Sequence, residues 1–138
     1  MECNFMYLPL FSEEQKKLFL ELAFHMVMAD GVFSDEERNV IDCYYSETKC
    51  KPLDEKSIRE LNTVFNDMKS KLGDREKKIV IFEMLGLALA DGDYAEEEKK
   101  IIEDLLKHLN ISHDFVDKCK AVLGEYFDLQ NKINTLVL

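Results

Sequence analysis

The chain has 138 residues, of which 46% are hydrophobic and 33% are charged, with only five Gly and two Pro. This composition indicates one globular domain over residues 1–138 and leaves little turn material for a many-stranded sheet, so we expect helices. The net charge of -10 argues against nucleic acid and against an anionic membrane surface, because like charges repel.

Targeting and cysteine patterns favour a cytoplasmic protein. The longest apolar run, residues 79–90, contains Glu83 and is too short to cross a bilayer. Residues 1–6 carry an acidic residue where a secretory signal would be basic. No CxxC pair occurs, so a zinc ribbon and a thioredoxin-type motif are not supported, and we expect buried or idle thiols. The four cysteines are Cys3, Cys43, Cys50 and Cys119.

Two helices are expected in the first part of the chain. The capping box Ser12–Gln15 predicts the start of a helix that ends near Ala29. Apart from Glu21 and His25 this helix is apolar on nearly every side, so we expect it at the centre of the core. A second capping box, Ser34–Glu37, predicts a short helix to about residue 47.

The middle of the chain predicts two more helices. Asp54 is expected to cap a third helix that ends at Gly73. Asp74 starts a fourth, which is again apolar on nearly every side and is the expected counterpart of the first. The buried face of the third helix is expected to comprise Ile58, Leu61, Phe65, Met68 and Leu72.

The last part predicts a fifth helix, Glu96–Leu109, ended by Asn110 in a left-handed conformation. Ser112 is expected to cap a final helix over about residues 112–136. Its apolar residues follow a heptad spacing, which suits a seam packed either against the protein's own body or against a second copy. The seam residues are Phe115, Cys119, Val122, Tyr126, Leu129, Ile133 and Leu136.

Segments 29–42 and 90–103 repeat each other. In "ADGVFSDEERNVID" and "ADGDYAEEEKKIIE" nearly half of the aligned positions are identical, and most of the others are conservative. The pattern predicts an all-α, single-domain bundle of about six to seven helices. A helix–acidic turn–helix unit is duplicated in it, over about 12–47 and 74–109, with pseudo-two-fold symmetry.

The same segments resemble the TerB-like family, the tellurite-resistance-associated helical proteins, whose relatives include the N-terminal domain of membrane-anchored DnaJ-like co-chaperones. The resemblance is carried by "MADGVFSDEER" and "LADGDYAEEEKKII" and covers about residues 12–123. It implies an all-helical fold with an internal pseudo-two-fold, a metal site built from the acidic residues of both turns, and no enzymatic activity. The chain has no HPD triplet and no transmembrane segment, which puts a direct chaperone-recruiting role in doubt.

Each acidic turn offers two carboxylates to one cation. Asp30 is followed seven positions later by Glu37, and Asp91 in the same way by Glu98. Carboxylate oxygens suit hard divalent ions, so Ca²⁺ or Mg²⁺ is favoured. Apolar residues occupy the ligand positions of an EF-hand, which excludes that motif. The reserve ligands are Asp35, Asp93 and Glu96.

Two metal-free roles of the acidic turns stay open. Gly31 and Gly92 suit helix stops, and acidic residues stabilise a following helix N-terminus without any ion. The turns could equally form a surface that recognises a protein partner. One detail favours the cation: Ala95 replaces the capping Ser34 in the second copy, yet Glu98 remains.

The remaining polar residues predict no enzyme. Glu21 and His25 are spaced for a hydrogen bond or a proton relay, but no nucleophile accompanies them. Glu83 would have a raised pKa if it were buried. His108 and His113 straddle a helix break and are expected at the surface.

The sequence therefore predicts a non-enzymatic, cytoplasmic, stress-associated protein that binds a divalent cation through its acidic turns. The alternative is an interaction scaffold or co-chaperone-type module without metal. It would act through its acidic surface or its C-terminal helix, as a monomer or as a dimer through that helix, with an unknown protein partner.

Overall fold

The computed structural model describes residues 7–29, 31, 35–89 and 94–138, with the side chains of Glu36 and Glu37 left out. These residues form helices without any strand, which confirms the all-α prediction. The duplication within the bundle stays a prediction. The α-helices are α1 (Glu13–Val27), α2 (Asp35–Thr48), α3 (Leu61–Lys71), α4 (Asp74–Leu89), α5 (Glu96–Leu109) and α6 (His113–Val137), with 3₁₀ turns η1 (Leu8–Leu10) and η2 (Glu55–Ser57).

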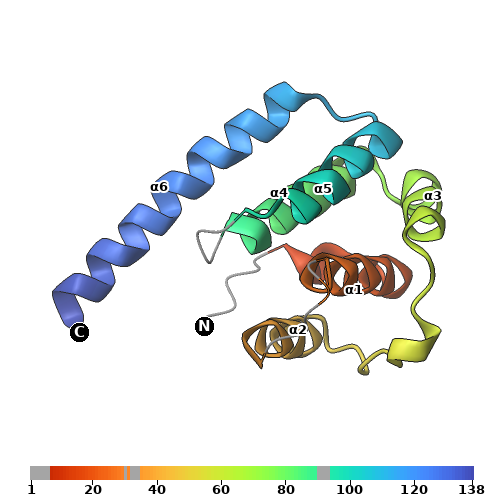
Figure 1. The fold of residues 1–138 in the computed structure, drawn as a ribbon, viewed down its shortest axis with the longest axis horizontal. Coiled ribbons are helices and arrows are strands. Elements are labelled where there is room, and N and C mark those ends of the chain that lie inside the picture. The colour runs from red at the N-terminus through yellow and green to blue at the C-terminus, as the bar shows by residue number, and fades with distance from the viewer. Residues whose placement is uncertain (1–6, 30, 32–34, 90–93) are drawn as a thin grey trace.

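Helices α1 and α4 lie at the centre of the bundle (Figure 1). Helix α1 packs against α2, α3 and α4, and α4 also packs against α5 and α6. Their near-continuous apolar sequences fit this position, because each must bury more than one face. On the α1–α2 side the Phe19 ring meets the Tyr44 ring edge-on, with 5.0 Å between centroids. The expectation that these two helices are central is confirmed.

Local signals place the helix ends well. The Ser12 hydroxyl accepts a hydrogen bond from the Gln15 N–H at 3.2 Å, and the Gln15 side chain accepts one from the Ser12 N–H at 2.9 Å. Asn110 ends α5 with φ 56°, as predicted. Ser112 takes the N-cap position of α6 but makes no capping hydrogen bond there. The second capping box involves residues outside the described part of the chain.

The third helix differs from its prediction. Asp54 caps only the short turn η2, where its Oδ1 accepts a hydrogen bond from the Lys56 N–H at 3.0 Å. The chain is extended at Ile58 and Glu60, and α3 begins at Leu61. The interruption has a tertiary cause, since the backbone N–H of Arg59 bonds to Glu21 on α1 instead of continuing a helix.

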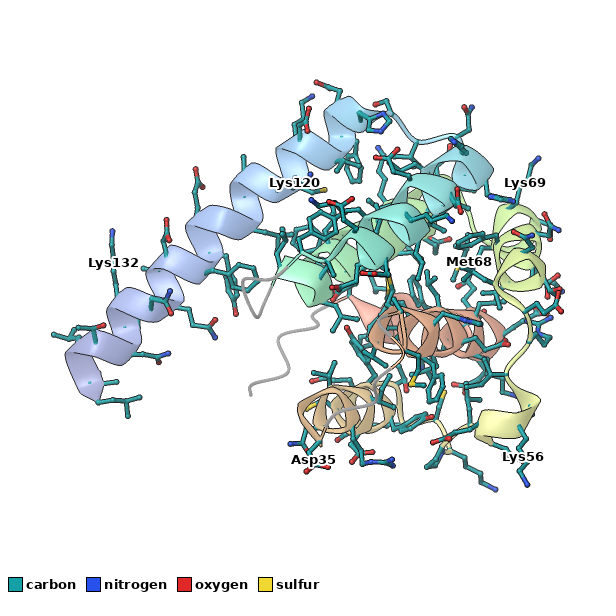
Figure 2. All side chains as sticks on the ribbon, in the orientation of Figure 1. Asp35, Lys56, Met68, Lys69, Lys120 and Lys132 are labelled. Atoms are coloured by element: carbon teal, nitrogen blue, oxygen red, sulfur yellow. The ribbon has the colours of Figure 1, made fainter. Side chains whose placement is uncertain are left out.

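Helix α6 only partly joins the bundle. Its N-terminal half packs against α4 through Val116, Cys119 and Leu123, which are buried. Its C-terminal half extends past the other helices (Figure 1). Lys132 is labelled in this half in Figure 2. None of the helices that the structure describes could cross a membrane.

The cysteines correct one expectation. Cys50 and Cys119 are free thiols, as expected. Cys43 is disulfide-bonded, so the expectation of an idle thiol is wrong at that position.

The two serines at helix starts provide a matched test of capping. We expect Ser12→Ala to lower the free energy of unfolding by about 1 kcal/mol, because it removes a formed cap. Ser112→Ala removes no such bond and should change it by less than about 0.5 kcal/mol. Urea unfolding followed by circular dichroism measures both. Equal losses from the two variants would contradict this assignment.

Candidate functional site

The structure places the four predicted ligands unevenly. Asp30 and Asp91 lie outside the described residues, and Glu37 is described only as part of the α2 backbone. Glu98 lies in the first turn of α5, half-buried. No three His, Cys, Asp or Glu residues within the described ranges lie close enough together to hold a metal ion. The proposed meeting of the four carboxylates therefore stays a prediction.

The reserve ligands are also divided. Asp35 is exposed at the start of α2, and Asp93 lies outside the described ranges. Glu96 is exposed and pairs with Lys99, with 3.2 Å between its Oε1 and the lysine Nζ. An exposed pair of this kind is worth little and would not prevent Glu96 from turning toward a cation.

Glu98 is oriented toward the second acidic turn. Its Oε1 accepts a hydrogen bond from the Ala95 N–H at 3.3 Å, which is one of the two bonds of a capping box. The other bond needs a side-chain oxygen at the N-cap, which alanine lacks. The carboxylate thus turns back to the residue that precedes α5. Glu96, Glu97 and Glu98 together fill the first turn of this helix, so negative charge is concentrated at its start.

Tyr94 joins this helix start to α6. The Lys99 and Lys120 ammonium groups lie 5.4 Å and 5.3 Å from the centre of its ring. Burial, followed by the charges of Glu103 and Glu98, raises the pKa of Tyr94 to about 12. Two cations at one aromatic ring hold the start of α5 against the N-terminal half of α6.

The best-connected polar cluster surrounds Arg59. Glu21 is buried on α1 and binds the guanidinium through both oxygens, at 2.8 Å to Nη2 and 3.1 Å to Nε. The other guanidinium nitrogen, Nη1, donates to Asp67 on α3 at 2.5 Å. The hydrogen bonds that the guanidinium donates, first those to Glu21 and then the one to Asp67, raise the pKa of Arg59 above its usual value.

The backbone of Arg59 is held as well. Its N–H donates to Glu21 Oε2 at 3.1 Å, and its carbonyl oxygen lies 2.8 Å from His25 Nε2, a distance at which the ring N–H donates. Both backbone groups are therefore satisfied by side chains four residues apart on α1. This explains why the predicted third helix is interrupted at this position.

Glu21 and His25, the pair whose spacing suits a hydrogen bond or a proton relay, both bind Arg59 in this structure. Arg59 itself was not predicted. The available signal was Glu21, because a carboxylate within an apolar helix requires a cationic partner when it is buried.

Glu83 lies elsewhere in the bundle and is almost fully buried, with 3% of its surface exposed. Burial, and then the charge of Glu47, raises the pKa of Glu83 to about 8. Burial and the charge of Glu83 in turn raise the pKa of Tyr44. No described residue donates a hydrogen bond to the Glu83 carboxyl, so the neutral form is favoured.

His108 and His113, on either side of the break between α5 and α6, bind different partners. His108 is half-buried, which differs from the surface position expected for it, because its ring packs on the Phe65 ring. Its Nδ1 lies 2.8 Å from the Asp104 carbonyl oxygen. His113 is exposed, as expected, and lies 2.8 Å from a Glu103 oxygen.

Comparison with known protein families identifies a match. A family model described as "Tellurite resistance protein TerB" matches residues 49–121, more than half of the chain. The matched span begins after α2, so it contains the second acidic turn, Arg59 and Asp67. The first acidic turn lies outside it, and so do Glu21 and His25, the α1 partners of Arg59. No curated protein and no solved structure matches.

Removing the Arg59 side chain should destabilise the fold. Arg59→Met leaves the buried Glu21 carboxylate without its guanidinium partner, and we expect a loss of about 2 to 3 kcal/mol in the free energy of unfolding. Arg75→Met is the control, because Arg75 is exposed and its ion pair among the described residues is with neighbouring Glu76. Its effect should stay below about 0.5 kcal/mol. Similar losses in both variants would argue against the cluster.

Burial of Glu83 predicts a dependence of stability on pH. The folded protein keeps this proton up to about pH 8, whereas the unfolded chain loses it near the ordinary glutamate value of 4.5. The free energy of unfolding should therefore fall as the pH rises from about 4.5 to about 8, by on the order of 5 kcal/mol.

Glu83→Gln should remove this decline, since its side chain has no proton to lose. Exposed Glu97→Gln serves as the control and should keep it. Chemical unfolding at several pH values measures the slope. An unchanged slope in Glu83→Gln would show that another group is responsible.

Proposed function

Because this chain belongs to the family of tellurite resistance protein TerB, we propose that it is a non-enzymatic, tellurite-resistance-type stress protein that binds a divalent cation. The proposed ligands are Asp30 and Glu37 from the first acidic turn and Asp91 and Glu98 from the second. Backbone carbonyls and water would complete the six to eight oxygen ligands that Ca²⁺ prefers, or the six that Mg²⁺ prefers.

The orientation of Glu98 carries this proposal. Its carboxylate points back to Ala95 at the end of the second turn, with 3.3 Å between oxygen and nitrogen. A small adjustment would let the same oxygens face a cation held over the turn. A complete capping box needs a side-chain oxygen at the N-cap, and Ala95 has none. Helix capping is therefore a weaker reason for a glutamate at position 98 than it would be if residue 95 were serine.

Charge supports the same proposal. Three consecutive glutamates crowd the first turn of α5, and the chain carries a net charge of -10. The positive end of the helix dipole offsets part of this repulsion, and a bound cation would offset more.

A non-enzymatic role fits the residues described. Glu21 and His25, the candidate acid–base pair, both hold Arg59, and Glu83 lies beside Glu47 and Tyr44 instead. A catalytic site built from these three groups would require them to converge on one cleft.

Thermal unfolding with added cations tests the proposal. A cation at 100 times its dissociation constant should stabilise the folded protein by about 2.7 kcal/mol, which raises the Tm by several degrees. The shift should be specific to Ca²⁺ or Mg²⁺, be reversed by chelator and be absent from Asp30→Asn/Asp91→Asn.

Glu60→Gln/Asp128→Asn is the matched control, because it removes two negative charges at exposed positions, one at the start of α3 and one in the C-terminal half of α6. This variant should respond to the cation like the wild type. If no cation shifts the wild-type Tm, or if both double variants lose the response alike, the acidic turns are not the site.

An interaction scaffold without metal is the second candidate function. The exposed apolar residues on α6 favour it, since large apolar patches on soluble proteins commonly mark interaction surfaces. Absence of any cation response, together with loss of partner binding on changing these residues, would select this candidate.

The proposed location is the cytoplasm, and cell fractionation tests it. One observation argues against this location: Cys43 is disulfide-bonded, and disulfides are rare in that reducing compartment. Recovery of the protein from an oxidising compartment would contradict the proposed location.

A further inference from the structure

The C-terminal half of α6 presents an apolar face that the bundle does not cover. We call it the α6 seam: Val122, Tyr126, Leu129, Ile133 and Leu136. These side chains are between 38% and 84% exposed. Single exposed apolar residues are common, but five in heptad spacing along one helix are typical of a surface that packs against another helix.

The seam continues into a cavity. A cavity of about 440 Å³ lies between α4 and α6, with Ile79, Phe82, Phe115 and Cys119 in its wall. Val122 belongs to both the wall and the seam. An apolar segment that covered the seam would therefore reach the cavity at its N-terminal end and bury more surface than the helix alone provides.

The charges around this cavity favour an apolar occupant over an anionic one. Arg75 pairs with Glu76 at 2.9 Å, and Lys118 pairs with Asp114 at 3.1 Å. Lys78 lies over the Phe115 ring, 5.9 Å from its centre. Two of the three cations are already neutralised, so little charge remains to recognise a carboxylate or phosphate.

We propose that the α6 seam is the interface of an antiparallel homodimer, in which each α6 packs along the other. This inference does not depend on cation binding. In this register Tyr126 packs against the partner's Leu129 and Ile133 against the partner's Val122, while Leu136 lies over the cavity that the partner's Cys119 lines. The contact covers about 26 Å of helix at 1.5 Å per residue.

Charge complementarity selects this orientation. Glu125 and Lys132 flank the seam on the same side, seven residues apart. Antiparallel packing places Glu125 opposite the partner's Lys132, and two-fold symmetry makes this pair twice. Parallel packing would place Glu125 opposite the partner's Gln130, and Lys132 opposite the partner's Val137, without any ion pair.

The charge of the rest of the molecule favours the same orientation. Each chain carries -10, and antiparallel packing places the two bundles at opposite ends of the paired helices. Parallel packing would place them side by side, where like charges repel more strongly. A second copy is therefore a partner whose shape and charge both fit this face.

Sedimentation over a concentration series tests the dimer. Wild type should sediment at twice the mass of one chain. Glu125→Lys and Lys132→Glu should each raise the dimer dissociation constant about tenfold or more, because each creates two like-charge contacts. The double variant Glu125→Lys/Lys132→Glu should restore wild-type affinity. Asp128→Lys makes the same charge change away from the seam and should have no effect.

Leu129→Asp should give a monomer with unchanged helix content by circular dichroism, which separates a lost interface from a lost fold. A wild type that is monomeric at every concentration would overturn the proposal. So would single charge reversals that weaken the dimer without rescue in the double variant, since the register would then be wrong. An apolar small molecule found by mass spectrometry in a monomeric protein would assign the cavity to that occupant instead.

Discussion

The hydrogen bonds of Arg59 are the interaction on which the placement of α3 beside α1 depends. Glu21 on α1 accepts hydrogen bonds from the backbone N–H and the guanidinium of Arg59, and His25 on the same helix binds the Arg59 carbonyl oxygen. Asp67 on α3 accepts a further hydrogen bond from the guanidinium. One residue between two helices is thereby fixed at every polar group. Because α3 then begins at Leu61, it lies where it can pack against both α1 and α5. The cluster also supplies the counter-charge that lets Glu21 remain buried in an apolar helix.

Features determined by neighbouring residues could be predicted, and those determined by distant ones could not. The capping box at Ser12 and the left-handed stop at Asn110 follow from residues within one turn, so both were found. The interruption before α3 depends on Glu21 and His25, which are 38 and 34 residues from Arg59. Spacing within the chain carries no signal for such a contact. The period of Ile58 and Leu61 instead suggested a continuous helix.

In the candidate sites too, the sequence predicts the position of a residue along the chain but not its contacts in three dimensions. The position of Glu98 at the start of α5 was predictable from the repeat, whereas its hydrogen bond to Ala95 is seen only in three dimensions. Burial of Glu83 could not be decided from the sequence, because an apolar helix needs only one exposed position to place an acid in water. The heptad seam of α6 has the same spacing whether it packs within one chain or between two. Its exposure from Val122 onward comes from helix length, since α6 extends past α4.

The packing of Tyr94 between two lysines gives the molecule an intrinsic optical probe. The chain has no Trp, so tyrosine emission is not masked by energy transfer to indole. Tyr94 adjoins the second acidic turn and contacts both Lys99 and Lys120, so its ring senses the start of α5 and the flank of α6 together. Any event that moves one of these elements changes the surroundings of this ring. The contribution of Tyr94, one of five tyrosines in the chain, to the absorbance and fluorescence would therefore change with that event without any attached label.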